Sequence, residues 1–329
     1  MPTYRGALAW RAAVVVAFVA MPQAARADPM TTSPEQGYDL GEMPGARAVA
    51  MGGALTALGV STTALYLNPA NMSLARVYHI EAFAAFSPEA QRQTYGAAAV
   101  DSVINTSHVA GGFAGTWSEL DPDGIDRTWT DLRAGASFPL GDYLSLGATA
   151  RWLRVEQAVS AGPFGTSAAS DGTPTSPIFN GPTFDLGATG SLGGFRLGVV
   201  GHNLTNPGTA LAPTTGALGL GFTSDTFSVE GDGLLDFTTY KKPEGRLMAG
   251  GEVFVADRYA LRAGWRYDAG TNIHSPSVGV GYIDPHWSVE LALRRDLLSD
   301  HAETYGVLSL RYFYDPTGAN SPPDEPDLN

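Results

Sequence analysis

Hydrophobic and polar residues alternate with a period of two, rather than 3.6, over residues 76–314. A period of two predicts β-strands, because successive side chains of a strand point to opposite faces. Fourteen candidate strands fit this region, each near the length of about 9–11 residues that a tilted membrane-spanning strand needs. Their predicted bounds are 76–86, 92–101, 107–117, 127–138, 143–155, 182–192, 195–203, 214–223, 226–237, 245–255, 259–268, 276–283, 286–296 and 304–314.

One face of these strands is apolar, with aromatic residues toward its ends, and the other face is polar. In the strand 143–155, for example, Leu144, Leu146 and Trp152 alternate with Ser145 and Arg151. Two architectures share this alternation. A soluble sandwich buries its apolar face, whereas a transmembrane barrel turns its apolar face outward to lipid and its polar face inward.

The connections between strands favour the membrane barrel, because they alternate between tight and long. The tight ones are 139–142, 193–194, 224–225, 256–258 and 284–285, and the long ones are 118–126, 156–181, 203–213 and 238–244. Short turns at one rim and long loops at the other are typical of outer-membrane barrels. We therefore predict an all-β fold, a transmembrane antiparallel β-barrel of about 14 strands over residues 76–314.

The two ends of the chain are predicted to lie outside this barrel. Residues 1–27 have the features of a signal peptide: basic residues, an apolar run at 12–20, and small residues before a cleavage site after Ala27. A short buried helix is the alternative interpretation of that run. The tail 315–329 holds four Pro and four acidic residues, and it is predicted to be disordered because it offers little apolar surface to bury.

Residues 28–75 precede the strands and lack their alternation. They are rich in Gly and Ala, and short helices are predicted near 45–55 and 62–67, with a break at Asn68 and Pro69. One interpretation is a loop with two short helices. The other is a hatch, a plug packed inside the barrel, since fourteen strands enclose more space than their own side chains fill.

The composition and the absence of certain motifs exclude several classes of function. Charged residues make up only 16% of the chain, against roughly 25% in soluble domains. The formal net charge of −13 makes a nucleic-acid partner improbable. The absence of Cys excludes disulfides and Cys-ligated zinc. The six His show no H-x-x-x-H spacing, and no G-x-S-x-G motif occurs. We therefore expect no metal, no cofactor and no enzymatic activity; a Ser/His pair across neighbouring strands is the remaining enzymatic alternative.

Ionised residues recur on the polar face of the predicted strands. A turn centred on Asp257 would place Glu252 opposite Arg262, and such a pair contributes roughly 0.2–1 kcal/mol. These residues have two interpretations, as the polar lining of a channel or as anchors for the hatch. The candidates are Asp131, Arg133, Glu230, Asp232, Asp236, Glu252, Arg262, Arg266, Glu290, Arg294 and Arg311.

Two glycine pairs within strands, Gly219 with Gly221 and Gly279 with Gly281, have no helix after them. A phosphate-binding loop needs one, so these glycines do not form such a loop. We expect them to let the hatch backbone approach the wall, or to mark a bend in the barrel.

The segment 45–74, GARAVAMGGALTALGVSTTALYLNPANMSL, resembles the N-terminal signature of the FadL-like outer-membrane proteins, the long-chain fatty acid transporters and PorV-like barrels. Two departures are Ser61-Thr62-Thr63, where the family often has acidic residues, and Asn71 in place of Gly. Weaker similarities occur at 201–204 and in the late strands. The matching hatch motif comprises Gly45, Gly52, Gly53, Asn68, Pro69 and Ala70.

This resemblance implies a fourteen-stranded barrel closed by an N-terminal hatch in the outer membrane, surrounded by its lipids. It leads to the hypothesis of passive uptake of a hydrophobic, fatty-acid-like small molecule. The alternative is a PorV-like barrel whose extracellular loops engage an exported protein, which the 26-residue loop 156–181 and the acidic tail motivate. No ligand-contacting residue belongs to the shared motif, so none is carried over.

Overall fold

The computed structural model describes residues 44–103, 107–120, 127–157, 177, 179–208, 211–240, 242–297 and 302–314. The signal peptide, the hatch residues 28–43 and the tail 315–329 lie outside the described residues, so those assignments stay predictions. Among the described residues, no helix is both long and apolar enough to cross a membrane.

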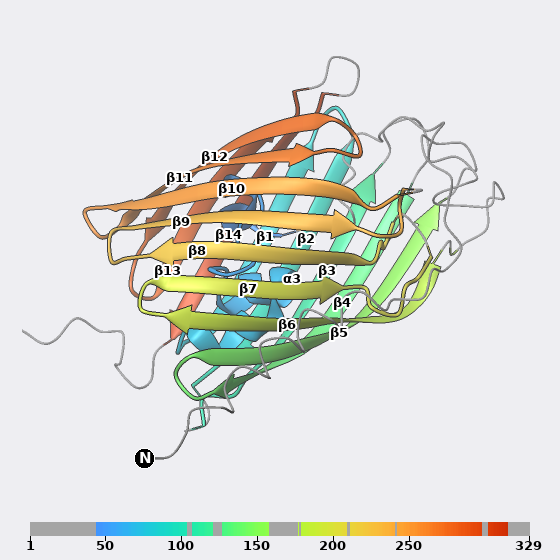
Figure 1. Ribbon diagram of the computed structural model, residues 1–329. Helices are drawn as coiled ribbons and strands as arrows, with labels where there is room; N and C mark the ends of the chain where they lie inside the picture. The colour runs from blue at the N-terminus through green and yellow to red at the C-terminus, as the bar shows by residue number, and fades with distance from the viewer. Residues whose placement is uncertain are drawn as a thin grey trace, which may run out of the picture.

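The strands form a closed antiparallel barrel in which β1 pairs with β14, as predicted. Each strand also pairs with its neighbours in sequence (Figure 1). The fourteen described strands are β1 Tyr78–Ser87, β2 Arg92–Asp101, β3 Ala110–Leu120, β4 Arg127–Leu140, β5 Leu144–Gln157, β6 Phe179–Leu192, β7 Phe195–His202, β8 Thr215–Thr223, β9 Phe227–Asp236, β10 Glu244–Val255, β11 Tyr259–Asp268, β12 Ile273–Ile283, β13 Trp287–Arg295 and β14 Thr304–Tyr314.

Several strand bounds differ from the prediction at prolines. The prediction ends β4 before Pro139 and begins β6 and β12 at Pro182 and Pro276, but all three prolines lie within strands. Their registered partners are Ser145, Trp152 and Trp265. Proline usually interrupts a ladder because it has no N–H to donate. Here the ladder continues past each proline, because pairing on either side holds the strand in place.

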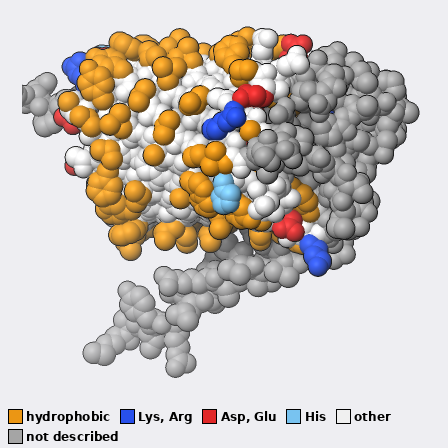
Figure 2. Space-filling view, turned by 90° about the horizontal axis from the view of Figure 1, so that it is seen from above, with side chains coloured by type: hydrophobic (Ala, Val, Ile, Leu, Met, Phe, Trp, Pro, Cys, Tyr) orange, Lys and Arg blue, Asp and Glu red, His pale blue; other side chains and the backbone are white. Residues whose placement is uncertain are grey.

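The outer surface of the barrel is apolar and the inner surface is polar. Leu146 is 41% exposed on the outside, whereas its neighbour Ser145 is 1% exposed on the inside. Aromatic residues pair near both ends of the strands, as Tyr282 does with Trp287 and Trp265 with Tyr267. Figure 2 shows a wall covered by hydrophobic side chains with few charges among them. An apolar band with aromatic ends and a polar interior defines a transmembrane barrel and excludes the soluble sandwich.

The two rims differ as predicted. The five tight turns all lie at one rim, where β1 begins and β14 ends, and the four long connections lie at the opposite rim. We call these the short-turn rim and the long-loop rim. In outer-membrane barrels short turns face the periplasm and long loops face the outside.

Residues 44–75 lie inside the ring of strands, where the blue helices of Figure 1 are seen between the front and back walls. They form α2 (Ala46–Ala50), a 3₁₀ turn η1 (Ser61–Thr63), α3 (Ala64–Leu67) and a 3₁₀ turn η2 (Pro69–Leu74). The Asn68 side chain begins η2 by accepting a hydrogen bond from the Ala70 N–H at 3.2 Å, with Pro69 at the favoured first position. The described part of the predicted hatch is thus a chain of short turns inside the barrel.

Glycines of the wall bring it into contact with the hatch. A Cβ at any of nine inward-facing glycines would lie closer than 3.0 Å to a hatch atom, so a larger residue would force the two apart. Gly219, Gly221 and Gly279 belong to this group, as expected, whereas Gly281 lies beside the wall residues Glu290 and Arg262. The nine are Gly135, Gly147, Gly187, Gly198, Gly219, Gly221, Gly250, Gly264 and Gly279.

Candidate functional site

A chain of alternating charges joins the hatch to the wall on the side of β10 to β14 and β1. The predicted pair forms: Glu252 is registered with Arg262, and the Arg262 Nε lies 2.5 Å from a Glu252 oxygen. Arg47 of α2 binds the same carboxylate at 2.9 Å. At the other end of the chain, Thr62 of η1 donates to Glu81 at 2.7 Å. The links between are Arg262–Glu290 at 2.7 Å, Glu290–Arg311 at 3.2 Å and Arg311–Glu81 at 3.1 Å.

These groups are nearly all buried, so they stay in place only while each has an opposite charge beside it. Since the chain of charges begins and ends on hatch residues, it fixes α2 and η1 to the wall. The sequence identified Glu252, Arg262, Glu290 and Arg311. It missed Glu81, whose place on the polar phase of β1 was the available signal.

A second buried cluster holds the opposite side of the hatch. Asp131 of β4 binds Arg133 at 2.7 Å and Arg151 of β5 at 2.8 Å. The Arg133 guanidinium donates to the backbone carbonyls of Leu65 and Tyr66, both at 3.3 Å, and lies over the Tyr66 ring. Burial raises the pKa of the Tyr66 hydroxyl to about 12, so this hydroxyl keeps its proton. Arg133 thus stabilises the end of α3, where backbone carbonyls have no helical partner.

A third contact is made by two carboxylates of β9. Asp232 accepts a hydrogen bond from the Thr56 N–H at 2.9 Å. Glu230 accepts from the N–H groups of Ala57 at 2.5 Å and Leu58 at 2.9 Å. Three consecutive backbone donors of the hatch therefore bind two acidic side chains of the wall.

The hatch motif occupies the contact surface between hatch and wall. Gly45 lies against Glu81, and Gly52 and Gly53 lie against Trp265 and Met248. Pro69 and Ala70 pack on Gly147 of β5, and the Asn68 amide donates to the Thr56 carbonyl at 2.8 Å and to the Thr189 hydroxyl at 3.0 Å. Gly52 and Gly53 have φ of +66° and +86°, which glycine adopts without strain.

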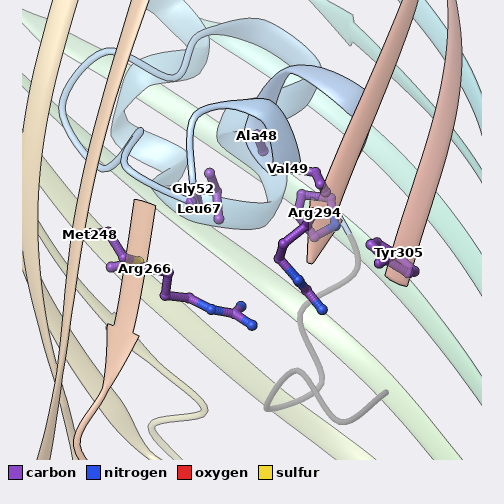
Figure 3. Close-up of a pocket in the computed structure, with 10 residues that line it drawn as sticks. Ala48, Val49, Gly52, Leu67, Met248, Arg266, Arg294 and Tyr305 are labelled. Atoms are coloured by element: carbon purple, nitrogen blue, oxygen red, sulfur yellow. The ribbon is translucent and has the colours of Figure 1, made fainter. Parts of the chain in front are cut away.

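A cavity lies between the hatch and the wall, toward the long-loop rim (Figure 3). Its hatch side is apolar, and the Arg266 and Arg294 side chains extend into the same space from β11 and β13. Its volume is about 30 Å³, room for about two water molecules. The lining residues are Pro44, Ala48, Val49, Gly52, Gly53, Leu67, Met248, Arg266, Arg294 and Tyr305.

The structure thus places all eleven charged candidates on the inner side of the barrel wall. It brings four together in the chain from Arg47 to Glu81, pairs Asp131 with Arg133, and separates Glu230 on β9 from both groups. Arg266 and Arg294 lie at the cavity. Asp232 and Asp236 are also buried on the inner face of β9. That the charged candidates line a transport path stays a prediction. Among the described residues, no group of three or more acidic or His side chains could hold a metal ion.

A closed, lipid-facing barrel with a docked internal hatch defines the class: a transmembrane β-barrel of the outer-membrane type. No protein-family model matches the sequence, and a search of curated proteins finds no relative.

Solved structures are similar to the whole barrel. CymD, a monoaromatic hydrocarbon channel, matches with a TM-score of 0.63 and 16% identity over 85% of this chain and 99% of CymD. The toluene transporter TbuX of Ralstonia pickettii matches with a TM-score of 0.61 and 15% identity, over 83% and 99%. A FadL homologue of Pseudomonas aeruginosa matches with a TM-score of 0.54 and 17% identity, over 87% and 99%. The chain therefore has the FadL-like fold that its N-terminal motif suggests.

Proposed function

We propose that this protein is an outer-membrane channel for the passive uptake of hydrophobic small molecules. The observation that carries the proposal is the cavity against the hatch. Its hatch side is formed by apolar groups such as Val49 and Leu67, and Met248 completes it from the wall. Channels and transporters with this fold, CymD and TbuX among them, act on aromatic hydrocarbons, which agrees with an apolar binding place inside the barrel. None of these similar proteins is described as an enzyme.

The cavity is too small to hold a hydrophobic substrate without some movement of the hatch. A cavity of about 150 Å³ accommodates benzene in other proteins, and the present one has about 30 Å³. Binding of even a small hydrocarbon would therefore require hatch side chains to move aside. We therefore propose that the hatch side chains around the cavity move when the substrate binds.

The finer hypothesis, a fatty-acid-like substrate, draws support from the two guanidinium groups at the cavity. Charge-assisted hydrogen bonds to guanidinium are strong, and a substrate carboxylate at Arg294 would compete with its present partners Glu303, at 3.3 Å, and Asp296, at 3.4 Å. A neutral hydrocarbon would gain nothing from the guanidinium groups. The secretion-assisting alternative depends on the loop 156–181, most of which lies outside the described residues, and no described feature favours it.

Liposomes with a lipopolysaccharide outer leaflet, which hydrophobic molecules cross slowly without a channel, test the proposal once they contain the purified protein. Entry of radiolabelled toluene and of a radiolabelled medium-chain fatty acid should each be faster than in protein-free liposomes, and the fatty acid should depend on Arg266 and Arg294. Ala48→Leu places extra atoms in the cavity and should slow both. Ala134→Leu, on the lipid face of β4, is the matched control. Equal entry with and without protein would refute the proposal.

A further inference from the structure

One stretch of the hatch, residues 54–60, belongs to no helix. We call it the strap. Residues with a left-handed backbone flank it on both sides, Gly52 and Gly53 before it and Ser61, with φ of +55°, after it. Ser61 is not glycine, and a hydrogen bond between its hydroxyl and the His79 ring at 2.8 Å holds it in place. The strap is therefore bounded by two sharp changes of chain direction at which it could pivot.

The strap covers a sector of the barrel that no hatch helix covers. Among the described elements, α2 contacts β11 to β14, η1 contacts β1 and β2, and η2 contacts β3 to β6. The strap lies on the remaining strands: Thr56 against Gly198 of β7 and Gly219 of β8, and Leu58 against Gly221. If the strap moved away, the interior beside β7 to β9 would lose its cover while the helices stayed docked.

A row of packed apolar side chains, which we call the apolar lane, joins the cavity to the strap. Met248 lines the cavity and also packs in a buried cluster with Val200, Ala217, Leu234 and Ala54. These residues come from β7, β8, β9 and β10, and Ala54 is the first residue of the strap. A hydrophobic molecule in the cavity therefore meets apolar side chains until it reaches the strap, beyond which lies the short-turn rim.

Besides this packing, the hydrogen bonds that the described residues of the wall make to the strap in this sector come from β9. Glu230 and Asp232 accept the Thr56, Ala57 and Leu58 N–H groups. Both carboxylates are buried and both lie against Gly219, so they are close to each other and repel when both are charged. A cation that acts on this pair is Arg196 of β7, which interacts electrostatically with Glu230. From the hatch itself, the amide groups of Asn68 and Asn71 donate to the Thr56 carbonyl.

We propose that the strap is the gate of the hydrophobic path: Glu230 and Asp232 latch it shut, and its release opens the lane to the short-turn rim while the rest of the hatch stays fixed. This inference rests on the proposed function for its substrate. It assigns the moving element and the residues that hold it.

A disulfide tests the gate, because the chain has no Cys of its own. The double variant Leu58→Cys with Gly221→Cys would join the strap to β8, since a Cβ at Gly221 meets the Leu58 side chain. Ser73→Cys with Ser137→Cys is the control; it joins η2 to β4, and the two hydroxyl oxygens lie 2.8 Å apart. Under oxidation, toluene entry into liposomes with a lipopolysaccharide outer leaflet should fall about tenfold in the strap pair alone and recover with reductant. Unchanged entry in the oxidised strap pair would overturn the proposal.

A labelling experiment tests the latch without a substrate. The single variant Ala57→Cys is exposed to a membrane-impermeant maleimide from the short-turn side, alone or together with Glu230→Gln and Asp232→Asn. Exchange of the two carboxylates for weaker amide acceptors should raise the labelling rate about tenfold. Asp257→Asn, in the turn between β10 and β11, should leave the rate unchanged. Equal rates in all three proteins would overturn the latch. If the wild type transports no hydrophobic probe but the latch variant labels faster, the proposed function fails while the moving strap stands.

Discussion

The barrel makes a quantitative prediction about depth in the membrane, best tested on β5. Tyr143 is an exposed aromatic residue in the turn just before β5, and Trp152 is an exposed aromatic residue toward the other end of its lipid face. A strand rises about 3.3 Å per residue and tilts by about 40°, so each residue advances about 2.5 Å across the membrane. The nine steps from Tyr143 to Trp152 then cover about 23 Å, close to the apolar band of roughly 25 Å in such barrels.

Three lipid-facing positions sample this depth. Leu144 lies about 2.5 Å inside the Tyr143 level, Leu146 about 7.5 Å and Ala148 about 12.5 Å, near the middle. Arginine costs roughly 0–1 kcal/mol near the interface and about 2–4 kcal/mol at the midplane. We therefore expect arginine to cost about 1 kcal/mol at Leu144, about 2 kcal/mol at Leu146 and about 3 kcal/mol at Ala148, each relative to alanine at that position.

The assay is reversible unfolding in urea in the presence of lipid vesicles, followed by tryptophan fluorescence. Alanine variants of the two leucines supply the references, so that lost packing is separated from the cost of the charge. Ser145 is no suitable control, because it points inward and is only 1% exposed. Equal costs at the three positions, or the largest cost at Leu144, would refute the outward phase or the membrane placement of β5.

Four further outcomes are expected. Unboiled protein should migrate differently from boiled protein in SDS gels, because a closed barrel has no free edges; identical migration would contradict the barrel. Deletion of residues 28–75 should leave a folded barrel through which liposomes swell in a small sugar, whereas equal swelling by the full chain would argue against a plug. Arg47→Met should destabilise the protein by about 1–3 kcal/mol, because it leaves the buried Glu252 carboxylate with one cation fewer, and amide exchange in α2 should accelerate; unchanged exchange would contradict the anchor. Burial raises the pKa of Glu89, but hydrogen bonds, first from the Thr304 N–H, lower it overall from 4.5 to about 2. Its contribution to stability is thus present above pH 4.5 and lost as the pH falls toward 2, so acid should destabilise the wild type more than Glu89→Gln, and parallel pH curves would refute this.

The sequence alone was enough to predict the strands of the barrel wall, their outward faces and the two rims. The period of two gives the strands and their outward faces, because each strand's alternation is a local property of consecutive residues. Tight and long connections give the two rims. The Glu252–Arg262 pair was also predictable, since a short turn sets the register of the hairpin around it. The strand ends at Pro139, Pro182 and Pro276 were misplaced, because neighbouring strands, which sequence reasoning did not weigh, continue the ladder past a missing donor.

Tertiary structure decided how the hatch and the wall meet. Arg47 binds Glu252 across 205 residues of sequence, and the Ala46 N–H donates to the Ser309 hydroxyl across 263. The sequence places Glu230 and Asp232 on the polar phase, but only the fold shows them holding three consecutive N–H groups of residues 56–58. The physical reason is that these contacts depend on where closure of the barrel places each strand around the hatch, and no local pattern of residues encodes that position.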